Sequence, residues 1–198
     1  PEIDGFDRYK GEWFHTGNWP HKKIDFSKKS VGIIGTGSSS IQATPIIGEE
    51  AEHLYVFQRT PNWSIPARNG PLPTEQLKKI KQSYQALRKS QRQLPLAAQR
   101  PPNRQSTFDV VDAERIGIYE KFWEIGGLSF LGAFKDIPTD AKANETAKNF
   151  VTQKIKQMVD DSDLVEKLVP EHHLGCKRPC SDTGYYSSFN RPNVSLID

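Results

Sequence analysis

A glycine-rich turn is the part of the chain whose residue types point most directly to chemistry. The turn runs from Gly35 to Ser40 as Gly-Thr-Gly-Ser-Ser-Ser, directly after the apolar, β-branched run at residues 31–34. Gly35 permits a tight turn, and Gly37 permits close approach of the backbone to a pyrophosphate, at which the next helix points its N–H groups. Ser40 stands where a third glycine is usual, and its small side chain weakens the close packing without preventing it. The sequence predicts a dinucleotide-phosphate site here, the alternative being an ordinary Gly/Ser loop.

A cation and a hydroxyl follow the next apolar run. Residues 53–57 are apolar and aromatic, and Arg59 and Thr60 come directly afterwards, whereas the three glutamates within residues 49–52 come before. A carboxylate at the end of this strand would accept from the ribose 2′-OH of NAD and would repel a 2′-phosphate. A guanidinium holds a phosphate with two charge-assisted hydrogen bonds, and a threonine hydroxyl adds a donor. The position of the glutamates before the strand, and of Arg59 and Thr60 after it, favours NADP(H) over NAD(H). The alternative is that Arg59 is an ordinary surface arginine at a strand end.

A second pair of cations, Lys177 and Arg178, lies in the turn-rich segment 175–180. One of them is suited to pairing with a cofactor phosphate and the other to stabilising an anionic intermediate. A solvated basic turn explains the pair equally well. His172, His173, Cys176 and Cys180 surround it, but structural zinc sites generally show two tight pairs of ligands, and no second cluster exists in the sequence. We therefore expect neither a metal nor a disulfide here.

These residues need a scaffold of strands and helices to bring them together. Strands are predicted at residues 31–34 and 53–57, with a helix between them that spans residues 41–47 and ends near Gly48. Strand, glycine turn, helix and strand in this order form a βαβ unit with parallel strands. A last strand is predicted at residues 194–197. The fold class is α/β, a Rossmann-like dinucleotide-binding βαβ domain with a mainly helical insertion.

The predicted insertion spans residues 74–168. An amphipathic helix carries apolar residues from Leu77 to Leu87, with Thr74 as its N-cap, and residues 93–105 form a loop. Further helices are expected at about 108–125, at about 140–159 with Thr139 or Asp140 as the cap, and at about 164–168. The segments 61–73 and 170–193 are rich in turn-forming residues and are expected to be irregular.

Composition excludes several classes of protein. The 198 residues suit one domain, or one domain with an insertion, and the net charge of +3 is too small for a dedicated nucleic-acid binder. No apolar run reaches the length of about 18 residues that a membrane span needs. The two cysteines exclude a disulfide-dense secreted scaffold. The chain begins at Pro1 without a signal peptide, and we expect a cytoplasmic excerpt of a longer protein.

Several ordered motifs resemble those of one enzyme family. Residues 9–20 resemble the fingerprint F-x-G-x-x-x-H-x-x-x-W-P of type I Baeyer–Villiger flavin monooxygenases, with Tyr9 in place of Phe; the Trp-Pro ending separates it from N-oxidising flavin monooxygenases. Residues 57–70, Lys177-Arg178-Pro179 and residues 184–194 are also similar to cyclohexanone-monooxygenase-type enzymes. The fingerprint residues are Gly11, His15, Trp19 and Pro20. The resemblance gives as cofactor-binding residues Gly35, Thr36, Gly37, Ser38, Ser39, Ser40, Gln42, Arg59, Thr60 and Lys177.

The resemblance implies two cofactors, NADP(H) and FAD, in two dinucleotide-binding domains of one polypeptide. NADPH reduces the flavin, the reduced flavin activates O2, and one oxygen atom enters a ketone to give an ester or lactone. Arg178 matches the family's active-site arginine, while Lys177 would hold the 2′-phosphate with Arg59 and Thr60. His15 and its neighbours would couple domain position to cofactor binding.

The resemblance also divides the chain. It implies a connector at 1–26, the NADPH-binding domain at 27–73 and 169–198, and the insertion at 74–168. The FAD domain lies outside this chain, so this segment alone is expected to be inactive. The alternatives are a non-catalytic NADP(H)-binding module, an N- or S-oxidising flavin monooxygenase, or a basic domain for nucleic acid, against which the small net charge argues.

Overall fold

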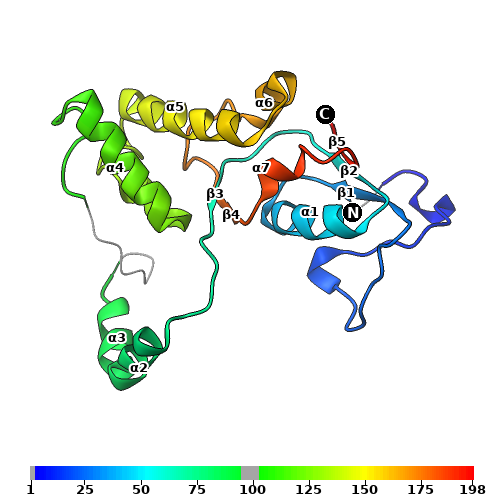
Figure 1. Cartoon of the computed structure of the whole chain (residues 1–198), viewed down its shortest axis with the longest axis horizontal. Coiled ribbons are helices and arrows are strands. Elements are labelled where there is room, and N and C mark those ends of the chain that lie inside the picture. The colour runs from blue at the N-terminus through cyan, green and yellow to red at the C-terminus, as the bar shows by residue number, and fades with distance from the viewer. Residues whose placement is uncertain (1–2, 95–102) are drawn as a thin grey trace.

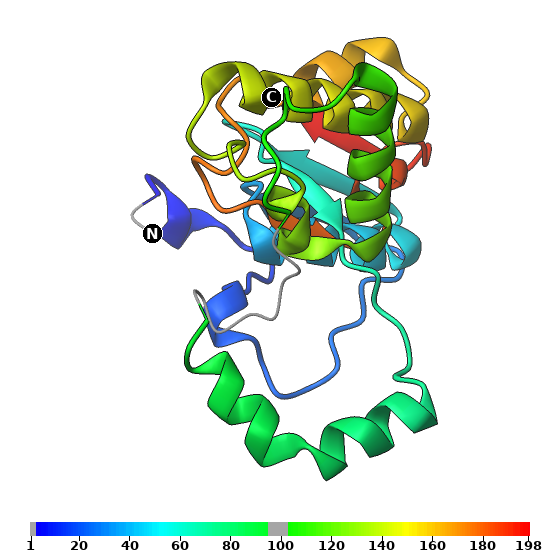
Figure 2. The same cartoon turned by 90° about the vertical axis from the view of Figure 1, so that its left-hand side faces the viewer.

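The computed structural model describes residues 3–94 and 103–198. A three-stranded sheet and the helix α1 form one end of the molecule, and the helices α4 to α6 gather beside it (Figure 1). Two short helices, α2 and α3, stand apart from both groups in either view (Figure 2). Eight residues of the predicted loop 93–105, numbers 95–102, lie outside the described residues.

The main sheet is parallel and consists of β1 (Ser30–Ile34), β2 (His53–Phe57) and β5 (Val194–Ile197) in the order β1-β2-β5. All three strands were predicted, and their positions are confirmed. Ile34 pairs with Phe57, and Phe57 pairs with Ile197, so the three carboxyl ends meet at one edge. Ligands of open parallel sheets bind outside the carboxyl ends of the strands. The segments after β1 and β2 are therefore brought to one edge.

Helix α1 (Ser38–Glu50) connects β1 to β2 and is longer than predicted. It begins at Ser38 and continues past Gly48 to Glu50, with Ala51 as its C-cap, so the predicted end at Gly48 is wrong. Gly48 is buried, and a Cβ atom at this position would lie 3.0 Å from Val194 Cγ2. The glycine thus serves the packing of α1 on the sheet.

A second, two-stranded parallel sheet lies where the sequence predicted irregular chain. It pairs β3 (Ser64–Pro66) with β4 (Cys180–Asp182) and is followed by the short helix α7 (Tyr185–Ser188). Backbone bonds from Cys180 N to Trp63 O, at 2.8 Å, and from Ala67 N to Asp182 O, at 2.7 Å, extend the pairing. This sheet joins the segment after β2 to the segment that carries Lys177.

Residues 74–168, predicted as an insertion, are mainly helical as expected, and the boundaries of the helices differ from the prediction. The single helix expected after residue 73 is divided at Ser83 into α2 (Thr74–Gln82) and α3 (Tyr84–Gln91). Thr74 is the first residue of α2 and Pro73 is the N-cap, so the predicted Thr74 cap is wrong. Neither helix has a buried residue, because no other element covers its apolar stripe in the described chain.

The remaining helices share one hydrophobic core with α1 and the two sheets. They are α4 (Asp112–Ile125), a 3₁₀ segment at Gly127–Gly132, α5 (Ala141–Met158) and α6 (Ser162–Leu168). Asp140 caps α5 by accepting a hydrogen bond from Ala143 N at 2.8 Å, which settles the choice between Thr139 and Asp140. Buried aromatic rings join α4 to the 3₁₀ segment, with Tyr119 5.7 Å from Phe130 between centroids. No helix within the described ranges is both long and apolar enough to cross a membrane.

Candidate functional site

A cavity of about 530 Å³ opens at the carboxyl edge of the main sheet. It is lined by residues that follow β1 and β2 and by one lysine from the segment before β4: Ile34, Gly35, Thr36, Gly37, Phe57, Gln58, Arg59, Thr60, Pro61, Asn62 and Lys177. The predicted residues Arg59, Thr60 and Lys177 therefore border one space together with the glycine turn. Among the described residues, no carboxylate belongs to this lining. The cavity presents backbone, a hydroxyl and two cations, a combination suited to phosphate groups.

The glycine turn has the backbone that its sequence requires. Gly35 has a φ of +96°, a conformation that side-chain-bearing residues rarely adopt, and its N–H bonds Phe57 O at 2.8 Å. Gly37 is the N-cap of α1 and has an ordinary φ of −84°. A Cβ atom added at either glycine would meet nothing within 4 Å, so the space in front of the turn is open. Within the described chain no side chain caps α1, which leaves first-turn N–H groups available to an anion.

Two hydroxyl groups of the turn are used within the protein. Thr36 is 8% exposed, and its Oγ1 donates to Thr60 O at 2.7 Å. Ser40, which replaces the third glycine of the motif, is buried and donates through Oγ to Gly35 O at 2.5 Å. Thr36 thus links the two cavity-lining segments, and Ser40 closes the turn on itself.

Ser40 and three other residues predicted to bind cofactor, Ser38, Ser39 and Gln42, lie on α1 outside the cavity lining. Ser38 Oγ donates to the sulfur of the buried Cys180 at 3.5 Å, and Gln42 Nε2 donates to Ser181 O at 3.0 Å. Ser39 is exposed in the first turn. The side chains of Ser38 and Gln42 therefore attach α1 to β4.

The basic pair lies in an exposed turn before β4. Lys177 reaches the cavity lining, whereas Arg178 is exposed and is not part of that lining. Gly175, with a φ of +94°, precedes them, and Leu174 forms an isolated bridge with Lys177. The structure thus separates the two cations, with Lys177 directed to the same space as Arg59.

The N-terminal fingerprint folds into exposed turns held by local contacts. His15 Nδ1 accepts a hydrogen bond from Gly17 N at 3.1 Å and caps a 3₁₀ turn at Thr16–Asn18. The ring of Trp19 lies 5.7 Å from that of Phe14 and 6.4 Å from that of Phe26, between centroids. His15 is therefore occupied by a backbone contact.

Local contacts surround the rest of the fingerprint. A Cβ atom at Gly11 would meet the outer end of the Tyr9 ring, which is 60% exposed and has room to move aside. Pro20 is half-buried, and Lys29 forms an ion pair with Glu12 at 2.7 Å. The ion pair attaches the fingerprint segment to the residue that directly precedes β1.

The chain is similar over its whole length to flavin-dependent oxygenases. It is 37% identical over 206 residues to 2-oxo-Delta(3)-4,5,5-trimethylcyclopentenylacetyl-CoA monooxygenase of Pseudomonas putida and 40% identical over 200 residues to cyclohexanone 1,2-monooxygenase of an Acinetobacter species. It superposes on the structure of a steroid monooxygenase bound to NADP with a TM-score of 0.94 and 45% identity. The chain is similar to Baeyer–Villiger monooxygenases, one of which, from Pseudooceanicola batsensis, is 36% identical to it over 200 residues. No protein-family model matches it.

The chain corresponds to one segment of these larger Baeyer–Villiger enzymes. All of it is aligned in each comparison, but it spans only 38% of the Pseudomonas putida relative, 36% of the Acinetobacter relative and 38% of the steroid monooxygenase chain. The resemblance inferred from the motifs is confirmed by these relatives. The roles of individual residues remain predictions.

Two of the lining residues that were not predicted as site residues, Gln58 and Asn62, have polar side chains. Gln58 is 8% exposed, and its Nε2 donates to Lys167 O at 2.8 Å and to Asp198 Oδ1 at 2.9 Å. Asn62 Nδ2 donates to Cys180 Sγ at 3.3 Å. Their positions beside Arg59 and Thr60 are the signal that would have found them, since the whole segment after a parallel strand lies at the same edge.

Proposed function

We propose that this chain is the NADPH-binding portion of an FAD-dependent Baeyer–Villiger monooxygenase that inserts one oxygen atom of O2 into ketones to give esters or lactones. The observation that carries the proposal is the convergence of Arg59, Thr60 and Lys177 on one cavity beside the glycine turn. These residues come from segments more than a hundred positions apart. Their shared chemistry suits an extra phosphate group on a dinucleotide.

The cavity supports the choice of NADP(H) over NAD(H) by its charge. Arg59 and Lys177 border it, and in the part of the chain that the structure describes its lining holds no carboxylate to accept from a ribose 2′-OH or to repel a phosphate. Two of the three glutamates before β2 are engaged elsewhere, since Glu49 pairs with Arg191 at 3.0 Å and Glu50 Oε1 accepts from Phe26 N at 3.2 Å. The third, Glu52, directly precedes β2 and so lies at the amino end of that strand. In this proposal Arg59, Thr60 and Lys177 hold the 2′-phosphate.

The glycine turn and the first turn of α1 take the pyrophosphate in a Rossmann-like arrangement. Gly35 supplies the left-handed backbone, and Gly37 supplies the open approach. The N–H groups of Ser38 to Ser40 lie at the positive end of the helix dipole. The proposed nucleotide-binding domain consists of residues 27–73 and 169–198, with the insertion at 74–168 and the connector at 1–26.

The oxygenation belongs to the parent protein and needs its FAD domain. When bound, NADPH supplies the hydride and FAD supplies the activation of O2. Arg178, which is exposed beside Lys177, stabilises negative charge that develops during attack on the ketone. The exposed fingerprint with Gly11, His15, Trp19 and Pro20 transmits domain position to the cofactor site.

A second candidate function is oxidation at nitrogen. A phenazine N-monooxygenase of Lysobacter antibioticus is 36% identical to the chain over 199 residues, close to the identity of the ketone-oxidising relatives. The ending Trp19-Pro20 of the fingerprint favours the ketone reaction. Assays of the parent protein with cyclic ketones and with aromatic N-heterocycles separate these two reactions.

Titration of the 198-residue chain with NADPH and NADH tests the cofactor proposal. We expect NADPH to bind at least about tenfold more tightly, and Arg59→Ala to reduce this ratio toward one, because the guanidinium contacts only the extra phosphate. Arg88→Ala, on the distant helix α3, is the matched control and should preserve the ratio. Equal affinities for both nucleotides, unchanged by Arg59→Ala, would refute the proposal.

A further inference from the structure

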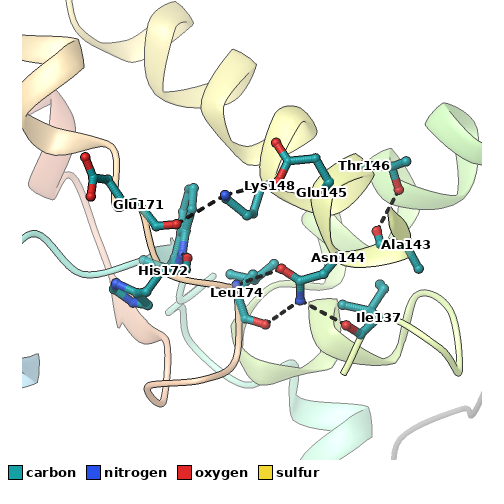
Figure 3. A network of polar contacts seen from close by, with 10 residues as sticks. Ile137, Ala143, Asn144, Glu145, Thr146, Lys148, Glu171, His172 and Leu174 are labelled. Carbon is teal, nitrogen blue, oxygen red and sulfur yellow. Dashed lines mark hydrogen bonds and ion pairs between the residues drawn. The ribbon is translucent and has the colours of Figure 1, made fainter. Parts of the chain in front are cut away.

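The segment that precedes Lys177 is attached to helix α5 by one buried amide. Asn144 is 4% exposed, and its Nδ2 donates to Ile137 O at 2.9 Å and to Leu174 O at 2.8 Å. Its Oδ1 accepts from Leu174 N at 3.0 Å. Figure 3 shows the amide between the backbone of Leu174 and that of Ile137. Asn144 therefore satisfies both backbone groups of Leu174, as a neighbouring strand would.

Two further side chains hold the same segment. Lys148, one turn along α5, donates through Nζ to Glu171 O at 3.3 Å, as Figure 3 also shows. Trp63, which is fully buried beside β3, donates through Nε1 to His172 O at 2.9 Å. The backbone of residues 171–174 is thus fixed from the helical insertion on one side and from the segment after β2 on the other.

A tight turn connects the anchored residue Leu174 to Lys177. Leu174 is 1% exposed, Gly175 has a φ of +94°, and Cys176 N bonds His173 O at 3.1 Å. Leu174 and Lys177 then form a bridge, and the Lys177 side chain reaches the cavity lining. Only Gly175 and Cys176 lie between the anchored Leu174 and the cation, and the turn leaves them little freedom. The backbone of Lys177 is placed by the backbone of Leu174.

We propose that Asn144 is a positioning residue for NADP selectivity, acting through Leu174 on Lys177. The inference rests on the proposed function, since it assigns Lys177 to the 2′-phosphate. A lysine side chain is long and flexible, so its contribution to a phosphate contact depends on where its backbone is held. In this proposal the helical insertion contributes to cofactor selectivity, because its helix α5 supplies the Asn144 amide that anchors the turn at residues 174–177.

A double-mutant cycle on the 198-residue chain tests this inference, with NADP⁺ and NAD⁺ as probes in calorimetric titrations. We expect Asn144→Ala to raise the Kd for NADP⁺ about tenfold and to change the Kd for NAD⁺ less than about twofold, because Lys177 contacts only the extra phosphate. Lys177→Ala should do the same. The double variant should lose no more selectivity than Lys177→Ala alone, since Asn144 acts through Lys177.

Control variants separate positioning from general damage. Thr146→Val removes the hydrogen bond to Tyr119 from the same helix and should leave both Kd values unchanged. If Asn144→Ala does not fold, Lys148→Met is the test, with Lys142→Met on the same helix as its charge control. Lys148→Met should raise the Kd for NADP⁺ about threefold, and Lys142→Met should not.

The outcomes distinguish this inference from the proposed function. A wild-type chain that binds both nucleotides equally would overturn the proposed function and the inference with it. A selective wild type whose selectivity survives Asn144→Ala, or Lys148→Met where that variant is the test, overturns the inference alone. So does a loss of NAD⁺ affinity equal to that of NADP⁺, or a further loss of selectivity in the double variant.

Discussion

The hydroxyl of Thr36 donates a hydrogen bond to the carbonyl oxygen of Thr60, with 2.7 Å between the two oxygens. This bond joins the glycine turn after β1 to the segment after β2, at the edge where both border the cavity. It fixes the distance between the backbone proposed to receive the pyrophosphate and the cation proposed to receive the 2′-phosphate. Thr36, predicted as a ligand of the cofactor, has its hydroxyl bonded to the backbone of Thr60, and we expect this bond to position the segment that carries Arg59.

Removal of this hydroxyl should weaken NADPH binding while the fold persists. Thr36→Val keeps the shape of the side chain and loses the bond, so we expect the Kd for NADPH to rise about fivefold, equivalent to roughly 1 kcal/mol. Thr36→Ser retains a hydroxyl and should bind as the wild type does. Fluorescence titration of the three chains measures the effect. A valine variant with wild-type affinity would show that the bond does not position the site.

The two glycines of the turn should respond differently to alanine. Gly35 has a φ of +96°, so Gly35→Ala should destabilise the chain by about 1–2 kcal/mol in urea unfolding. Gly37 has an ordinary φ of −84°, and Gly37→Ala should cost only about 0.5 kcal/mol of stability.

For nucleotide binding we expect the reverse order, with Gly37→Ala causing the larger loss of affinity. The methyl group of Gly37→Ala would enter the open space in front of the turn and weaken dinucleotide binding by at least about tenfold. We assign Gly35 to the backbone conformation of the turn and Gly37 to the approach of the nucleotide. If the two variants lose stability and affinity in the same proportion, this assignment is wrong.

Lys177 and Arg178 should have separate effects in the full-length parent protein. Arg178 is exposed and absent from the cavity lining, so Arg178→Ala should abolish ester formation and leave the Kd for NADPH within about twofold. Lys177→Ala should instead raise the Kd for NADPH about tenfold. Product analysis measures ester formation and nucleotide titration measures the Kd for NADPH in both variants. Retained oxygenation in Arg178→Ala would refute its catalytic role.

The main sheet was predictable because its signals are local. The runs at 31–34, 53–57 and 194–197 are apolar and β-branched, and a glycine turn follows the first of them. The strands β3 and β4 were not predictable, since each has three residues and neither shows a recognisable alternation. They form because two segments more than a hundred residues apart pair beside the buried Trp63.

In the candidate site, too, some residues could be predicted from local sequence and others could not. Arg59 and Thr60 were predictable at the sheet edge, because a parallel sheet brings the ends of its strands together. The bond of Asn144 to Leu174 was not, since nothing in the local sequence of a helix indicates its distant partner. Gly48 illustrates the converse error. A local rule predicts a helix end there, whereas tertiary packing against Val194 requires the glycine inside the helix.

The imidazole of His172 should make the stability of the chain depend on pH. Burial lowers its pKa below the ordinary 6.5, and the positive charges of Lys177 and Lys148 lower it further. Its Nε2 is buried and has no hydrogen-bond partner within the described residues, so the neutral ring suits its surroundings. The unfolded chain therefore binds a proton at higher pH than the folded chain does. The stabilising contribution of the neutral ring is complete above the ordinary pKa and is lost as the pH falls below it.

Urea unfolding at about pH 7.5 and about pH 5.5, on either side of the ordinary histidine pKa, measures this dependence. The wild-type chain should lose stability at the lower pH, and His172→Gln should lose less, because it removes the group that takes up the proton. His173→Gln, at the exposed neighbouring position, is the matched control and should lose as much as the wild type. If His172→Gln and the wild type lose equal stability, another group is responsible for the acid sensitivity, and the lowered pKa of His172 does not contribute to it.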